Sequence, residues 1–503
     1  MSTGNQTSVW LRKISRRELL RQLALAGLGA GAAGIMPACV PATPQVVKET
    51  VVVEKVVTPT PAPAKPVEIT YWQAPIWRYG KDNKTPNAPI DEWINYSIER
   101  FEAANPDIKV HLELIPWEQW GTKVNTAFAS GTLPNLLYGS PTVQWVQAGV
   151  LEPLDDYVTP EIREQWASYM LSGVTVFGRI YGIPTFANPN MYALSKTALE
   201  KYGGAEFIPT DEMRAFTIQA QEQAAAAFSD GKERFAIGIP VGDHPGALYF
   251  DFAQALLGRG VQMWDDTFER FIAHENPRSV EAMQWFVDAQ NKGWIIPNLP
   301  KWSDVDTFYW TLRCAMRGQW AGIQTELETA QAAGQAVKPF EIVLVSHPYD
   351  EKLKPHLAGA HQVFGFVVGR TPEPEKRAAA FRLGNWYALD PWVGEAWLVN
   401  GFFPTSKPQV EAVKGHPFLE DPNRRWVLDV YMQRYEPEPP TSQFLPQQNP
   451  RTAKILTEQK IADYSPGSFM LRMFQNLLLG KVSPAEMMTE LATKINTALG
   501  VKV

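Results

Sequence analysis

Hydrophobic residues change their spacing several times between positions 96 and 158. Ile98 and Phe101 lie three positions apart, which is the spacing of one helix face. Asn105-Pro106-Asp107 ends this helix, because proline disfavours helical backbone in the residue before it. In residues 108–114 the apolar side chains fall on every second position, as in a strand with one face in a core. The pattern therefore predicts a helix followed by a strand.

The alternation of helices and strands continues beyond this strand. A second helix is expected from about residue 117 to 129, a short apolar strand over 135–139 and another helix over 143–148. A strand, a crossover helix and a further strand are typical of a parallel sheet covered by helices on both faces. The fold class predicted from this pattern is α/β.

Similar patterns place elements elsewhere in the chain. Strands are expected over 67–72, 235–240 and 359–368, and helices over 212–228, from 247 and over 375–389. Asn276-Pro277 precedes another helix, with Ser279 near its cap. The last helix is expected to begin with Ser483 as its cap and Pro484 at its first position.

The first 66 residues are expected to contain an export signal and a linker, and not to belong to the folded domains. Arg16-Arg17 lies in a segment that resembles a twin-arginine export motif, and the apolar run over 23–36 is too short to anchor in a bilayer. Met36-Pro37-Ala38-Cys39 resembles a lipoprotein cleavage site with Cys39 as the lipidated residue, the alternative being an unmodified cysteine in a cleaved leader. Residues 40–66 are rich in proline and valine, which predicts an extended linker.

Composition narrows the classes of function. The chain has 45% hydrophobic and 20% charged residues and a formal net charge of -6, which suits a globular protein and argues against a nucleic-acid partner. Cys39 and Cys314 are its two cysteines, so we expect Cys314 to be a small buried apolar residue without a disulfide. Eighteen tryptophans weakly favour a sugar ligand, because their faces match the C–H face of a pyranose.

Several segments resemble one family. They read FEAANPDIKV at 101–110, ASGTLPN at 129–135 and WVQAGVLEPLDDY at 145–157. In this order they resemble the carbohydrate-binding family of extracellular solute-binding proteins that serve bacterial ABC importers. Asn135 stands where that family usually has Asp, and we expect it to cap or turn the chain. A YGIP turn at 181–184 and an A-M…G…W segment at 315–320 resemble further motifs of the family.

The resemblance implies a two-lobe periplasmic-binding-protein-like fold of the class II type, with the ligand cleft between the lobes. The predicted division is 1–39 export signal, 40–66 linker, 67–184 with 356–404 as lobe 1, and 185–355 with 405–503 as lobe 2. The chain would cross between lobes near Pro184, near Pro355 and near Pro404.

The resemblance also implies which side chains meet the ligand, because loops at the strand ends and a tryptophan after the A-M…G segment line the cleft in this family. The candidates are Trp72, Gln73, Trp77, Ser140, Trp145, Asn188, Asn190, Tyr192, Asp243, Trp320, Glu326 and Gln362. The structural alternatives are a packed loop for the residues near Trp77, a helix start with proline at its first position for Ser140, core packing for Trp320 and a surface position for Glu326.

The function implied is capture of a sugar or oligosaccharide by cleft closure, followed by delivery to a permease in the membrane. A monomer without cofactor or metal is expected. Alternatives are a non-sugar solute (a polyamine, a glycerol phosphate ester or a peptide) or a secreted glycan-processing enzyme, which would need two facing carboxylates. No complete catalytic motif is recognised in the sequence, so we expect a binding protein and not an enzyme.

Overall fold

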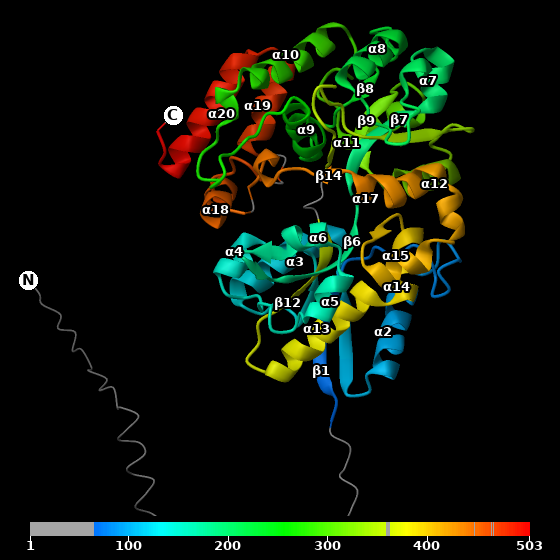
Figure 1. Cartoon of the computed structure of the whole chain (residues 1–503), viewed down its shortest axis with the longest axis vertical. Coiled ribbons are helices and arrows are strands. Elements are labelled where there is room, and N and C mark those ends of the chain that lie inside the picture. Colours follow the sequence, from blue (N-terminus) through cyan, green and yellow to red (C-terminus); the bar gives the residue numbers. More distant parts are fainter. Residues whose placement is uncertain (1–64, 359–362, 447, 464, 466, 503) are drawn as a thin grey trace, which may run out of the picture. The chain divides into compact units, whose positions relative to one another are not determined.

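The computed structural model describes residues 65–358, 363–446, 448–463, 465 and 467–502. The export and lipidation predictions, including Cys39, and the candidate Gln362 lie outside the described residues. The described residues belong to one compact unit that contains two larger sheets (Figure 1).

The first sheet has six strands in the order β13-β6-β12-β3-β1-β2. Their bounds are β1 Val67–Gln73, β2 Ile108–Leu114, β3 Leu136–Tyr138, β6 Gly182–Ala187, β12 Val363–Val368 and β13 Phe403–Pro404. β1 pairs in parallel with both β2 and β3, as predicted, whereas β12 runs antiparallel to β3 and β6. The sheet is therefore mixed, with its parallel part formed by the segment that the hydrophobic pattern identified.

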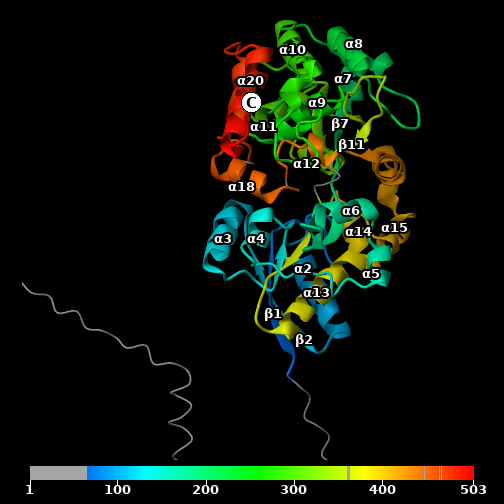
Figure 2. The same ribbon diagram turned by 60° about the vertical axis from the view of Figure 1, so that its left-hand side comes forward.

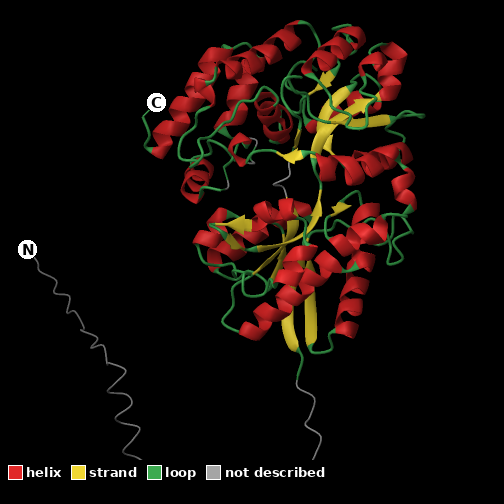
Figure 3. Cartoon of the chain, in the orientation of Figure 1, coloured by secondary structure: helices red, strands yellow, loops and turns green. Residues whose placement is uncertain are grey.

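Helices pack around the strands of this sheet (Figure 3). They are α2 Glu92–Ala104, α3 Trp117–Ser130, α4 Val143–Gln147, α5 Pro160–Gln165, α6 Ser168–Val174, α13 Pro374–Leu389, α14 Pro391–Val399 and α15 Lys407–Val413. α13 packs on β1, β6 and β12 in the middle of the sheet. α3 ends at Gly131, which takes a left-handed φ of 68° that glycine adopts without strain.

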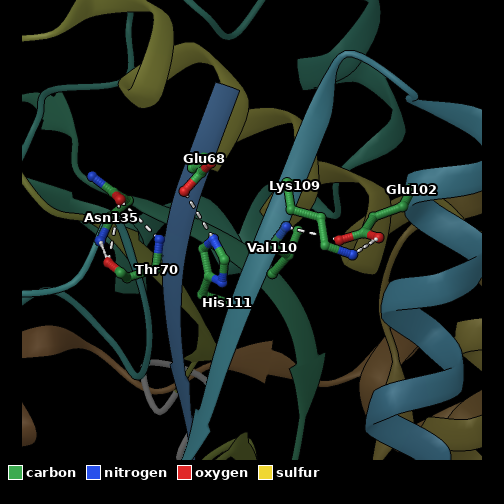
Figure 4. Close-up of polar contacts among 7 residues, drawn as sticks. All are labelled: Glu68, Thr70, Glu102, Lys109, Val110, His111 and Asn135. Carbon is green, nitrogen blue, oxygen red and sulfur yellow. Dashed lines mark hydrogen bonds and ion pairs between the residues drawn. The ribbon is translucent and has the colours of Figure 1, made fainter. Parts of the chain in front are cut away.

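Asn135 ties β1 to the start of β3 (Figure 4). Its Oδ1 accepts hydrogen bonds from the backbone N–H of Thr70 at 2.9 Å and from the Thr70 hydroxyl at 3.2 Å. The Asn135 N–H in turn donates to the Thr70 hydroxyl oxygen at 3.0 Å. Asn135 was expected to cap or turn the chain; the structure instead shows it linking two neighbouring strands, and the link from its side chain needs only an amide or carboxylate oxygen.

The second sheet has four strands in the order β10-β7-β9-β8. The bounds are β7 Asn190–Ser195, β8 Ile237–Gly238, β9 Met316–Trp320 and β10 Ile342–Val345. Around it lie α7 Lys196–Tyr202, α8 Ile218–Phe228, α9 Ala253–Leu257, α10 Pro277–Asn291, α11 Trp302–Trp310 and α12 Ile323–Ala332. A π-helical turn, η2 Ala247–Phe252, leads directly into α9.

The carboxyl-terminal part is mainly helical, as predicted. Its helices are α16 Pro422–Trp426, a π-helical turn η5 Val427–Tyr431, α17 Met432–Arg434, α18 Pro450–Glu458, α19 Phe469–Leu478 and α20 Pro484–Leu499. α19 and α20 pack on α10, beside the second sheet (Figure 2). Ser483 caps α20 in a reciprocal capping box with Glu486, which confirms the predicted helix start.

Short strand pairs and 3-10 turns complete the described residues. The pairs are β4 Thr175–Val176 with β5 Arg179–Ile180, and β11 His356–Leu357 with β14 Glu436–Pro437. The turns are η1 Ala205–Phe207, η3 Ala273–Glu275, η4 Pro417–Glu420 and η6 Pro440–Ser442. Within the described part of the chain, no helix has the length and apolar character needed to cross a membrane.

The third change of sheet lies later than the predicted position at 404/405. Gln409 of α15 donates hydrogen bonds to the carbonyl oxygens of Tyr387 and Asp390, so α15 still packs with the first sheet's helices. Asn423 of α16 instead donates to the carbonyl of Ile342 on β10. The chain therefore passes from one sheet to the other between α15 and α16.

The cap residues fix where three helices begin. The predicted start of α8 near 212 is wrong, because Thr217 accepts a hydrogen bond from the Ala220 N–H as its cap and the helix begins at Ile218. Asn276 caps α10, and Ser279 lies near this cap as predicted. α4 begins at Val143, as predicted, because the Thr142 hydroxyl accepts from the Trp145 N–H; the alternative start with Pro141 at the first position is not observed. In each case the nearest side-chain oxygen able to reach a free helix N–H sets the start.

Candidate functional site

Three segments meet at one edge of the second sheet. β9 ends at Trp320, β7 begins at Asn190, and the loop after β8 carries Asp243 and His244. β8 is parallel to β9 and β7 is antiparallel to it, so the end of β9 pairs with the start of β7 at Asn190 and Trp320. Ligands of α/β proteins bind beyond the carboxyl ends of such strands.

An aromatic cluster occupies this edge, and we call it the aromatic wall. The Trp320 ring centroid lies 5.0 Å from that of Phe250 and 5.6 Å from that of Tyr249. Trp302 at the start of α11 lies 6.0 Å from Phe250, and Phe444 stacks 6.2 Å from Tyr249. Trp320, Tyr249 and Trp302 are half-buried, so the wall keeps part of its aromatic surface exposed.

Gly318 allows the wall to form. A Cβ at this position would lie 2.5 Å from the Phe250 Cβ, closer than two carbon atoms can approach. Trp320 follows two residues later and so projects from the same face of β9. The glycine brings η2 against the strand, and the strand period then places Trp320 beside Phe250.

The wall reaches the first sheet at Phe364 on β12. The Trp320 and Phe364 rings are 6.5 Å apart, and Phe364 stacks 5.4 Å from Phe186 on β6. Phe186 also packs 4.5 Å from Phe402, just before β13. Aromatic side chains thus run continuously from one sheet to the other where β6 leads into β7.

Polar side chains lie on the segments next to Trp320, along the chain and across the β7–β9 pair. The Glu326 carboxylate on α12 accepts a hydrogen bond from Gln319 Nε2 at 3.0 Å. Burial raises the pKa of Glu326, and the nearby Arg317 guanidinium opposes that rise. The side-chain oxygens of Asn188 and Asn190 are buried, and no hydrogen-bond partner for either was found within the described structure. These two amide oxygens can accept hydrogen bonds from hydroxyl groups.

Asp243 is exposed in the loop after β8. Its Oδ1 accepts a hydrogen bond from the backbone N–H of Trp302 at 3.0 Å, and the His244 ring lies 4.5 Å from the Trp302 ring. Asp243 therefore holds the start of α11, and with it Trp302, at the aromatic wall. The second carboxylate oxygen of Asp243 belongs to this solvent-exposed side chain, next to the aromatic wall.

Three predicted contact residues are buried inside their sheets' cores. The Gln73 side chain is fully buried and accepts a hydrogen bond from the Tyr71 hydroxyl at 2.6 Å. Trp77 stacks 3.7 Å from Trp93 and is 2% exposed. Tyr192 is 2% exposed and faces a small, partly open cavity. Their placement corrects the expectation of ligand contact, because packing partners already cover each side chain.

Trp72, Ser140 and Trp145 belong to the first sheet's side of the molecule. Trp72 and Trp145 are half-buried and pack on an apolar cluster under α3 and α4. Lys123 Nζ lies 4.8 Å from the Trp72 ring, a cation–π contact. Ser140 is half-buried at the end of β3. Trp72 lies in β1, Ser140 follows β3 and Trp145 lies in α4, and none of the three belongs to the ring cluster of the aromatic wall.

Sequence reasoning missed Tyr249, Phe250, Trp302 and Phe444. The signal that was present is the loop after β8 together with Gly318, which marks a close approach of backbone. The π-helical turn that turns Tyr249 and Phe250 toward β9 has no distinct hydrophobic period, so the pattern predicted only a helix from residue 247.

Comparison with known families bears directly on this two-sheet arrangement. Residues 85–346 match the family described as "Bacterial extracellular solute-binding protein". The chain belongs to this family. The match covers more than half of the 503 residues and includes β7, β9 and the aromatic wall up to Trp320. It confirms the predicted family, and the family's description places its members outside the cell.

The curated relatives match a smaller share of this chain than the family does. A binding protein of Brucella abortus and one of Brucella suis are each 26% identical over 210 residues, which is 41% of this chain and 48% of each relative. The chain thus spans about half the length of the curated relatives it matches. These relatives are named as binding proteins and not as enzymes.

Solved structures confirm the fold. An ABC transporter solute-binding protein of Thermotoga lettingae bound with α-D-tagatose superposes with a TM-score of 0.64 at 19% identity, covering 86% of this chain and 100% of that one. UgpB of Mycobacterium tuberculosis in complex with glycerophosphocholine gives 0.63 at 15% identity, covering 87% and 99%. Maltose-bound MalE3 of T. maritima gives 0.60 at 17% identity, covering 86% and 99%. The predicted two-lobe solute-binding fold is therefore confirmed.

Proposed function

We propose that this protein captures a sugar or oligosaccharide outside the cell and delivers it to an ABC permease in the membrane. The observation that carries the proposal is the half-buried Trp320 at the end of β9, set in an aromatic wall that continues to Phe364 of the other sheet. Such a surface suits the C–H face of a pyranose, with placed polar groups fixing its orientation.

The polar groups beside Trp320 support a hydroxyl-rich ligand. Asn188 and Asn190 offer buried amide oxygens, and Glu326 offers a carboxylate that already accepts one hydrogen bond from Gln319. Buried acceptors without donors are unfavourable, so a ligand with hydroxyl donors would gain by filling them. Of the candidates from the sequence, Asn188, Asn190, Trp320 and Glu326 form the proposed contact set on this side, with Asp243 positioned next to it.

A phosphate ester is less well supported. Arg317 is fully buried, lies 4.6 Å from the Trp302 ring and pairs through Nη1 with Asp306, which compensates its charge, while its Nε and Nη2 have no hydrogen-bond partner among the described residues. Arg78 is exposed on the loop after β1. A polyamine would be attracted by Glu326 and Asp243, but burial raises the pKa of Glu326 and weakens its negative charge. A neutral ligand requires none of these charges.

Ligand would shift the protein toward a closed form only through contacts that are better satisfied when the two sheets' edges approach. The ring contact between Trp320 and Phe364 already brings the two sides together. The proposed function needs no bond breaking, so we propose a binding protein without enzymatic activity.

Export and anchoring complete the proposal. Residues 1–39 would direct export by the twin-arginine or the general route, Cys39 would carry the lipid, and residues 40–66 would tether the monomeric binding unit to the membrane. Mass spectrometry of the membrane fraction tests the anchor, because a lipidated Cys39 would be the first residue of the mature chain.

A thermal-shift screen tests the ligand class. The full chain would be melted with mono- and oligosaccharides, polyamines, glycerol phosphate esters and short peptides. A ligand at a hundredfold excess over its Kd stabilises the folded state by about 2.7 kcal/mol and raises the melting temperature. A saccharide that raises it without being hydrolysed supports the proposal. A shift with amines, phosphate esters or peptides alone would exclude sugar while keeping the fold.

A further inference from the structure

A small, partly open cavity lies in the second sheet's half of the molecule, on the face of β7 and β8 that η2, α9 and α10 cover. Its volume is about 30 Å³. The polar side chains that line it belong to Tyr192, Gln221, Asp251, Gln254, Arg259 and His347. It is separate from the exposed surface of the aromatic wall, although Phe250 lines it from the wall's side.

Buried polar atoms around this cavity lack partners. Asp251 Oδ2 and both ring nitrogens of His347 have no hydrogen bond to any described residue, and the two residues are 7% and 6% exposed. The Tyr192 hydroxyl accepts a hydrogen bond from Gln221 Nε2 at 2.9 Å, so its own hydrogen can donate elsewhere. Leaving one such group buried and unpaired costs about 1 to 3 kcal/mol. The cavity therefore needs an occupant that both donates and accepts.

Charge narrows the class of occupant. Burial lowers the pKa of His347 to about 3, so its ring is neutral near pH 7, and burial raises the pKa of Asp251, which favours the uncharged carboxyl. Arg259 lines the cavity, and Arg317 influences Asp251 from across the sheet. A neutral imidazole and a carboxyl with a raised pKa beside two guanidinium ions disfavour a cation. A volume of about 30 Å³ exceeds the 10–15 Å³ that one water molecule requires and leaves room for about two.

We propose that this cavity is a hydration site in which about two water molecules bridge Asp251 to His347 and Tyr192, and thereby fix the π-helical turn η2. Two bridging waters would provide the donors and acceptors that Asp251 Oδ2, the His347 ring and the Tyr192 hydroxyl lack. Each water would then make about three hydrogen bonds, counting the one between them.

Water bound in this cavity would influence where Tyr249 and Phe250 of the aromatic wall lie. Asp251 follows Phe250 directly in η2, and a π-helical turn holds one residue more than an α-helical turn. Reverting η2 to an α-helix would rotate Tyr249 and Phe250 relative to β9. Asp251 is thus a positioning residue for the wall, and this consequence alone rests on the proposed function.

Crystal structures of the unliganded full chain and of two variants test the proposal. In the wild type and in Asp251→Asn, which keeps a polar oxygen, we expect water at hydrogen-bond distance from residue 251 and His347. In Asp251→Val, which is smaller and removes both oxygens, we expect loss of the bridging water and a displacement of Tyr249 and Phe250. His347→Leu serves as the second variant if Asp251→Val does not fold, with loss of the same water expected.

Three results would overturn the inference. They are an empty cavity in the wild type, an ion or a larger molecule in place of water, or an unchanged wall and unchanged waters in the variant that lacks the polar group. Because no sugar is present in these crystals, the outcome is independent of whether the protein binds a saccharide.

Discussion

At the scale of single residues, Asp251 and His347 shift the pH dependence of stability in opposite directions. In the unfolded chain His titrates near 6.5 and Asp near 3.9. The pKa of His347 is lowered to about 3, so the free energy of unfolding decreases as the pH falls below 6.5. The reason is that the unfolded chain then binds a proton that the folded state does not bind. The raised pKa of Asp251 has the opposite effect above pH 4, because the folded state keeps a proton that the unfolded chain loses.

The two effects oppose each other, so single variants should separate them. Asp251→Asn should lose stability more steeply than the wild type as the pH falls below 6.5, because the His347 effect is then unopposed. Since the folded-state pKa of His347 is about 3, that effect is worth at most about 1.4 kcal/mol per pH unit. His347→Gln should instead gain stability relative to the wild type as the pH falls, because only the Asp251 effect remains. Urea unfolding at several pH values measures both slopes. Variants that keep the wild-type pH dependence would contradict the two opposing pKa shifts.

The sequence identified some residues at this scale and not others. Cys314 was predicted to be a small buried residue, and it is fully buried. Trp320 was identified through the A-M…G…W segment, and it lies at the end of β9. Gln73 and Tyr192 were expected at the ligand, yet they face cores, because a strand turns alternate side chains to opposite faces and no motif fixes which face is covered.

At the scale of elements, Gly318 controls the approach of η2 to β9. Gly318→Ala would place a Cβ 2.5 Å from the Phe250 Cβ, so one of the two elements must move. We expect a loss of about 1 to 3 kcal/mol in unfolding free energy and a weaker ligand affinity. Gly415→Ala is the matched control, since nothing lies within 4 Å of its added methyl group. Equal free energies of unfolding for the two variants, measured in urea, would show that the close approach of Gly318 to Phe250 does not affect stability.

Asn135 makes the corresponding link in the first sheet. Asn135→Ala removes the acceptor for the Thr70 N–H and hydroxyl, and we expect a loss of about 1 kcal/mol in unfolding free energy. Asn135→Asp keeps an acceptor oxygen, so its loss should be smaller. Chemical denaturation at neutral pH compares the two. A larger loss for the aspartate variant would indicate that the Asn135 side-chain N–H₂ contributes instead.

Elements with a clear period were predicted well. β2 has the bounds that its alternating residues indicated, and α20 begins at the predicted serine cap. β8 is shorter than the predicted strand, since Pro240 has no N–H to donate to a neighbouring strand. The π-helical turn η2 could not be predicted, because packing against Gly318 accompanies a local change in helical hydrogen bonding that hydrophobic spacing does not encode.

At the scale of the whole molecule, the two-sheet fold follows from the order of strands and helices and from the family motifs. The position at which the chain changes sheet for the third time could not be predicted in this way. It depends on Gln409, which holds α15 on the first sheet's helices through hydrogen bonds to Tyr387 and Asp390. The ligand cannot be identified from the fold alone, since structures of similar fold carry tagatose, maltose or glycerophosphocholine.

The most direct test of the account is isothermal titration of the wild type and two tryptophan variants with the saccharide that gives the largest thermal shift. Trp320→Ala removes the centre of the aromatic wall, whereas Trp386→Ala removes a half-buried tryptophan that packs 5.9 Å from Phe101 on the first sheet's side. The account predicts that Trp320→Ala weakens binding at least about tenfold, or about 1.4 kcal/mol, while Trp386→Ala leaves the Kd unchanged. An unchanged Kd in a folded Trp320→Ala variant, or no saccharide binding by the wild type, would contradict it.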